Sequence, residues 1–180
     1  QIGMVTQDTS LLHRSVRDNI LYGRPDACEA EVIAAAKKAQ AQDFILGLED
    51  GRGRKGYDAH VGERGVKLSG GQRQRLCIAR ALACEPKVLI ADEAVSALDV
   101  SVQEQILELL DDIQSRLQIG ILFITHDLRV ASQICNRLIV MHEGRIVEQG
   151  LARDVLLKPE QAYTRSLLAA APGQNWTFSV

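Results

Sequence analysis

The sequence predicts an α/β fold in which short buried strands form an open parallel sheet, with an inserted α-helical subdomain. Residues 88–91 and residues 119–125 are short apolar runs that each end in polar residues, as buried parallel strands do. Helix-capping residues and apolar spacing between residues 15 and 39 predict the helical subdomain. With 180 residues, the chain is long enough to bury one hydrophobic core.

Two capping signals predict the first helices. Ser15 is placed to cap a short helix through Ile20, and Asp26 is placed to cap a longer helix. Residues 49–62 are rich in glycine and charge, and they predict a surface loop.

Residues 68–75 (Leu-Ser-Gly-Gly-Gln-Arg-Gln-Arg) predict a helix start that could bind an anion. Ser69 can cap a helix that begins near Gly70. Gly70 and Gly71 have no side chains to block an approaching anion, so their backbone N–H groups can point outward toward a phosphate. For an isolated Ser-Gly-Gly-Gln, an ordinary capped helix is the alternative.

Asp92 and Glu93 directly follow the apolar run at residues 88–91. They therefore lie at the carboxyl end of the predicted strand, where ligands of open α/β sheets bind. Two adjacent carboxylates there can divide the work, since Asp92 can hold Mg²⁺ and Glu93 can polarise an attacking water. The alternative is that the pair only caps the following turn.

The second run ends in His126 and Asp127. Taken alone, a histidine at a strand end is more often structural, and Asp127 is placed to cap the next helix. Farther along, residues 137–142 and 145–149 flank a glycine turn and predict a hairpin that closes the sheet. Helices are expected at residues 152–157 and 163–170, and residues 172–180 have no clear pattern.

Taken in order, these motifs resemble those of the ATP-binding-cassette (ABC) ATPases. Residues 68–75 are similar to that family's signature sequence, Asp92 and Glu93 to the end of its Walker B strand, and residues 96–99 to its D-loop. His126 is similar to the H-loop histidine, and residues 2–8 are similar to the Q-loop, in which a glutamine, here Gln7, ends a core strand.

The resemblance implies a P-loop NTPase core that binds ATP and Mg²⁺. It implies catalytic roles for Glu93 and His126, and Mg²⁺ contacts for Asp92 and Gln7. The implied nucleotide contacts are Gln7, Ser69, Gly70, Gly71, Gln72 and Asp99. Residue 99 would also link the two sites of a head-to-tail dimer.

One expected motif is missing from these residues. The pattern G-x-x-x-x-G-K-[ST] is matched only as far as residues 51–56, which are followed by Tyr57 in place of lysine. The sequence therefore predicts an N-terminally truncated core. Its expected parts are a strand end at residues 1–6, the Q-loop, helical subdomain and signature helix at 7–85, a catalytic core at 86–150, and a helical extension at 151–180.

The resemblance points to two subfamilies. Residues 7–75, including Val-Gly-Glu-Arg-Gly at 61–65, resemble the nucleotide-binding domain of ABC exporters. Residues 76–170, including Glu-Gly-Arg-Ile-Val-Glu-Gln-Gly at 143–150, resemble peptide and nickel importer ATPases. Recombination within the shared signature would explain the combination, and chance divergence is the alternative.

The implied function is ATP hydrolysis coupled to solute transport, with a peptide-like substrate favoured. Transmembrane transporter subunits and a second ABC ATPase domain are the expected partners, at the cytoplasmic face of the membrane. The alternative is a catalytically incomplete module that lends its signature to a partner. A net charge of −2 gives no sign of nucleic-acid binding, and the four cysteines lack metal-site spacing.

Overall fold

The computed structural model describes residues 1–62 and 65–171, and the chain divides into two compact units, Gln1–Ile124 and Thr125–Val180. The unpatterned segment at 172–180 and two residues of the exporter-like stretch at 61–65 lie outside the described residues. In the first unit, the elements are β1 (Ile2–Thr6), α1 (Val16–Leu21), α2 (Glu29–Lys38), α3 (Gln42–Leu46), the 3₁₀ turn η1 (Gly56–Asp58), α4 (Gly70–Ala83), β2 (Val88–Asp92), α5 (Val100–Leu117) and β3 (Gly120–Ile124). In the second, they are α6 (Leu128–Ile134), β4 (Arg137–His142), β5 (Arg145–Leu151), α7 (Ala152–Leu157) and α8 (Ala162–Ala170).

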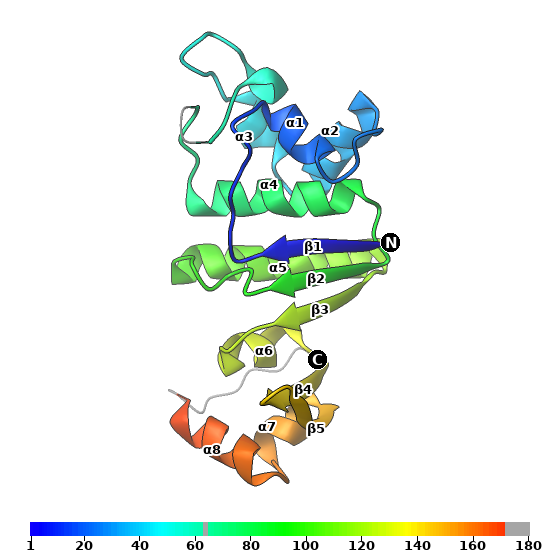
Figure 1. The fold of residues 1–180 in the computed structure, drawn as a ribbon, viewed down its shortest axis with the longest axis vertical. Coiled ribbons are helices and arrows are strands. Elements are labelled where there is room, and N and C mark those ends of the chain that lie inside the picture. Colours follow the sequence, from blue (N-terminus) through cyan, green and yellow to red (C-terminus); the bar gives the residue numbers. More distant parts are fainter. Residues whose placement is uncertain (63–64, 172–180) are drawn as a thin grey trace. The chain divides into compact units, whose positions relative to one another are not determined.

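The first unit is built on a three-stranded parallel sheet in the order β1-β2-β3. Strands β2 and β3 were predicted from their apolar runs and β1 from the resemblance to the Q-loop, and the structure confirms all three. Val5, Leu89 and Ala91 are buried, and α4 lies along β1 with the shorter helices on its far side (Figure 1). Helix α5 supplies five more buried apolar side chains to this core.

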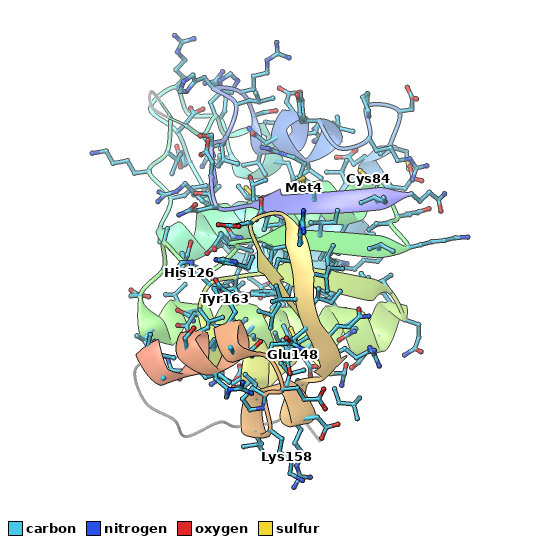
Figure 2. All side chains as sticks on the ribbon, turned by 60° about the horizontal axis from the view of Figure 1, so that its bottom comes forward. Met4, Cys84, His126, Glu148, Lys158 and Tyr163 are labelled. Atoms are coloured by element: carbon cyan, nitrogen blue, oxygen red, sulfur yellow. The ribbon has the colours of Figure 1, made fainter. Side chains whose placement is uncertain are left out.

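The opposite sheet face is apolar and exposed. Strand alternation puts Ile2 and Met4 on this face, with exposed fractions of 64% and 54%, and Leu122 lies in register with Met4 through β2. Figure 2 shows Met4 on β1. Among the described residues of the first unit, none fully covers these side chains.

Helices α1 and α2 pack on α4 and form the helical part of the unit (Figure 1). Ser15 caps α1 as predicted, because its Oγ accepts a hydrogen bond from the Asp18 N–H at 3.0 Å. The cap predicted at Asp26 is wrong. Helix α2 starts at Glu29, and the Glu31 carboxylate accepts from the Cys28 N–H at 2.7 Å, so the capping interaction falls two residues later.

The loop between α3 and α4 is organised by the buried carboxylate of Asp50. The His60 N–H donates to one of its oxygens at 2.9 Å, and the N–H groups of Arg52 and Arg54 donate to the other at 2.9 and 3.2 Å. The Arg54 guanidinium adds an ion pair at 2.7 Å. These donors, the His60 N–H first, hold the pKa of Asp50 far below its usual range, so this predicted surface loop has a fixed internal anchor.

The second unit pairs a β-hairpin with three helices. Strands β4 and β5 form their own two-stranded antiparallel sheet, so the prediction that the hairpin closes the parallel sheet is wrong. The predicted helices α7 and α8 are present. Glu148 of β5 accepts from the N–H groups of Glu160 and Gln161 at 2.8 and 3.2 Å, which ties the start of α8 to the hairpin (Figure 2).

Candidate functional site

The parallel register brings three of the predicted site residues to one edge of the sheet. Thr6 at the end of β1 pairs with Asp92 at the end of β2, so Gln7 and Glu93 directly follow neighbouring strand ends. Asp92 and Glu93 are half-buried, and Gln7 is exposed. A carboxylate, an amide oxygen and a second carboxylate therefore share the edge at which ligands of parallel α/β sheets bind.

The backbone at Glu93 is left-handed, with φ of 51°. It is held there from both sides, because the Glu93 N–H donates to the Ile124 carbonyl of β3 at 2.9 Å and its own carbonyl accepts from the Ser96 N–H and hydroxyl at 3.2 and 3.0 Å. Ala94 and Val95 are buried immediately afterwards. A non-glycine residue in this region is strained, and such strain concentrates at functional sites.

Ser69 caps the start of α4 as predicted, and Ser69 and Gln72 form a capping box. Ser69 Oγ accepts from the Gln72 N–H at 3.2 Å, while Gln72 Oε1 accepts from the Ser69 N–H at 2.9 Å. Among the described residues, the N–H groups of Gly70 and Gly71 have no hydrogen-bond partner. They remain available as donors, and the Ser69 hydroxyl can still donate its proton, so the helix start can bind an anion.

Packing gives these glycines a second role that the sequence did not reveal. A Cβ atom at Gly71 would lie 2.7 Å from Val102 Cγ1, and one at Gly70 would lie 3.1 Å from Leu98 Cδ2. Asp99 caps α5 by accepting from the Val102 N–H at 3.2 Å. The signature-like segment and the D-loop-like segment are thus packed directly against each other within this unit.

His126 belongs to the second unit and follows β3. Asp127 caps α6 as predicted, accepting from the Arg129 N–H at 2.9 Å, and its carboxylate forms an ion pair with the Arg129 guanidinium at 2.9 Å. That guanidinium lowers the pKa of Asp127. His126 and Arg129 line a cavity of about 360 Å³ whose other wall is the end of α8, at Leu167 and Ala170. His126 is labelled in Figure 2.

The donor atoms at the sheet edge suit Mg²⁺ bound together with a nucleotide. Magnesium prefers oxygen ligands and is usually held by one or two carboxylates plus phosphate oxygens, which Asp92 and Gln7 can complete. The described residues contain no group of three or more His, Cys, Asp or Glu side chains that could hold a metal by themselves.

Sequence reasoning missed one residue at this site. Gln74 of α4 is buried, although its position in the sequence gave no sign that its amide would be inside. Tertiary packing of α4, which no local pattern encodes, decides this burial.

The comparisons with known proteins point to one family. The family model described as "ABC transporter" matches residues 1–96. An "Uncharacterized ABC transporter ATP-binding protein" of Haemophilus influenzae is 56% identical over 87% of this chain and 25% of its own length. A Staphylococcus aureus protein named "Putative multidrug export ATP-binding/permease protein" is 46% identical over 88% of this chain and 26% of its own length.

A solved structure shows the same fold. A bacterial Atm1-family ABC exporter with ATP bound matches 96% of this chain and 29% of its own, with a TM-score of 0.74 and 37% identity. The chain thus spans about a quarter of the length of the relatives it matches. Within the residues described, no helix is both long and apolar enough to cross a bilayer.

Proposed function

Because the chain belongs to the ABC transporter family, we propose that it forms part of an ATP-binding domain that hydrolyses Mg-ATP to drive solute export. The observation that carries this proposal is the strand register that sets Gln7, Asp92 and Glu93 at one sheet edge. The family match and the exporter with ATP bound support the assignment. The reaction would be in-line attack of water on the γ-phosphate.

Each site residue has a role that its environment supports. Asp92 and Gln7 would hold Mg²⁺, which neutralises charge on the phosphates when it is bound. Glu93 would orient and polarise the attacking water, and its backbone is fixed at the strand end. His126 would donate to the γ-phosphate.

The signature segment would act on a second nucleotide. Ser69, Gly70 and Gly71 would donate to the γ-phosphate of ATP bound to a second ABC domain in a head-to-tail dimer, with Gln72 fixing the Ser69 rotamer. Asp99 would link the two sites. Since residues 1–180 contain no P-loop motif, the loop that cradles the β- and γ-phosphates would come from outside these residues.

We also propose export as the direction of transport. The named Staphylococcus relative and the solved structure are both exporters by name, and both matches extend past the signature into the region predicted to be importer-like. The predicted peptide-like substrate gains no support from these relatives. The membrane partner would be a transmembrane domain of the exporter type, which would place the chain at the cytoplasmic face.

The decisive experiment replaces Glu93 with glutamine in the transporter that carries this chain. Glu93→Gln keeps the shape but removes the carboxylate, so ATP turnover should fall at least about 10²-fold while ATP remains bound. The matched control is Glu104→Gln, an exposed glutamate of α5. Turnover within about twofold of the parent would refute the role of Glu93.

A second outcome would favour the non-catalytic alternative. If the parent hydrolyses no ATP at this chain's own site while Ser69→Ala still abolishes hydrolysis by a partner domain, the chain only lends its signature.

Docking to the membrane domain can be tested by crosslinking from the segment between β1 and α1. Arg14 is exposed, and an Arg14→Cys variant in a Cys28→Ser background removes the exposed native thiol. Capture of an exporter-type membrane domain is expected. Selective capture of a peptide-importer membrane subunit would overturn the proposal.

A further inference from the structure

Gln74 is a buried amide without a hydrogen bond. Its side chain is only 1% exposed, and neither its nitrogen nor its oxygen has a partner among the described residues. Leaving a buried polar group unsatisfied costs about 1–3 kcal/mol, so each such group in a native protein calls for an explanation. An apolar side chain of similar size would avoid this cost in the arrangement seen here.

The face of α4 that carries Gln74 is defined by its neighbours. Residues three and four apart share a helix face, so Gln74 lies on the face of Gly70 and Gly71, which pack against Leu98 and Val102. Two turns farther along the same face, the Ala81 carbonyl oxygen would lie 3.0 Å from a Cβ atom added at Gly3, so α4 approaches β1 closely there. Gln74 therefore lies between the start of α5 and the strand that leads to Gln7.

A neighbouring thiol indicates that the Q-loop-like segment is close as well. Burial raises the pKa of Cys77, one turn after Gln74, and the negative charge of Asp8 raises it further. Asp8 directly follows Gln7, so the segment after β1 passes near this part of α4. Helix α4 packs on both β1 and α5, so three segments that would contact nucleotide or Mg²⁺ lie near the part of α4 that carries Gln74: residues 7–8, residues 69–72 and residues 96–99.

We propose that Gln74 is a positioning residue that pairs with backbone groups of residues 7–8 or 96–99 when nucleotide is bound. An amide offers two donors and one acceptor, so it can join two loops at once. The pairing would make the signature helix move with the loops that hold Mg²⁺ and the second site. This inference rests on the proposed ATP hydrolysis, because it assigns a role within that reaction.

The test is Gln74→Met, which keeps the length and flexibility of the side chain but removes both polar atoms. In the assembled transporter, kcat for ATP should fall at least about tenfold with KM changed less than about threefold. The unfolding temperature of the chain should stay the same or rise, because the unpaired amide is gone. Gln105→Met, on the exposed side of α5, is the matched control and should change neither kcat nor KM.

Hydrogen exchange adds a readout that a purely structural residue would not change. Mg-ATP should protect the amides of residues 7–8 and 96–99 in the parent, and this protection should be lost in Gln74→Met. Unchanged kcat and unchanged protection would overturn the inference. So would a variant that fails to fold or melts well below the parent, since that would mean the amide is already paired. A parent without ATP hydrolysis would instead refute the proposed function itself.

Discussion

Replacing Gly71 by alanine should destabilise the first unit, although alanine is normally the better helix former. The added Cβ would lie 2.7 Å from Val102 Cγ1, closer than real Cβ atoms come to their neighbours. Val102 is β-branched and sits in α5, where one χ1 rotamer dominates, so its methyl group cannot turn away. Helices α4 and α5 would therefore have to move apart at this contact.

The expected size follows from two opposing terms. Overpacking costs about 1–3 kcal/mol, and the helix preference of alanine over glycine offsets at most about 1 kcal/mol. We expect a net loss of about 1 kcal/mol in the free energy of unfolding, which lowers the melting temperature by about 2–4 °C for a chain of this size.

Two variants make the measurement specific. In Gly70→Ala the new Cβ meets Leu98 Cδ2 at 3.1 Å, the far end of a flexible side chain, so stability should be unchanged or higher. In Gly71→Ala/Val102→Ala the obstructing methyl is gone, and a double-mutant cycle should recover about 1 kcal/mol of coupling. Urea unfolding followed by circular dichroism would supply all the values. If Gly71→Ala is as stable as Gly70→Ala, or Val102→Ala gives no recovery, the packing explanation is wrong.

Three further predictions concern other parts of the chain. The lowered pKa of Asp50 contributes stability that is fully present above the unfolded value of about 4 and is lost as pH falls toward the lower native value, so Asp50→Asn should melt earlier at pH 7 and show a weaker acid dependence in calorimetry. Ser15→Ala should cost about 1 kcal/mol in urea unfolding, because the Asp18 N–H loses its acceptor, and no change would mean that the cap is not stabilising. His126→Ala should lower ATP turnover about 10²-fold in steady-state assays, and turnover within about twofold of the parent would refute the assigned role.

Features encoded within a few residues of each other could be predicted from the sequence. Strands β2 and β3, the caps at Ser15, Ser69 and Asp127 and the two C-terminal helices follow from local apolar runs and capping residues, whereas β1 was predicted from the resemblance to the Q-loop. The cap of α2 was misplaced by two residues because both Asp26 and Cys28 precede the helix, and only the backbone shows which one meets Glu31.

Features that depend on distant packing could not be predicted. The local sequence pattern of β4 and β5 does not indicate whether they join the parallel sheet or pair only with each other. The buried state of Gln74 and the contact between Gly71 and Val102 arise because α4 packs on α5, whose contacting residues lie far along the chain. For the same reason, the glycines of the signature were explained at first only by access for an anion.

The left-handed backbone at Glu93 has an evolutionary consequence. A non-glycine residue in this conformation costs about 1–2 kcal/mol, which glycine at the same position would not incur. A laboratory library selected only for thermostability should therefore enrich glycine at position 93, whereas a library selected for transport should restore glutamate. Selection for stability and selection for activity would therefore favour different residues at position 93. A trade-off between stability and activity would then depend on the backbone conformation of a single residue.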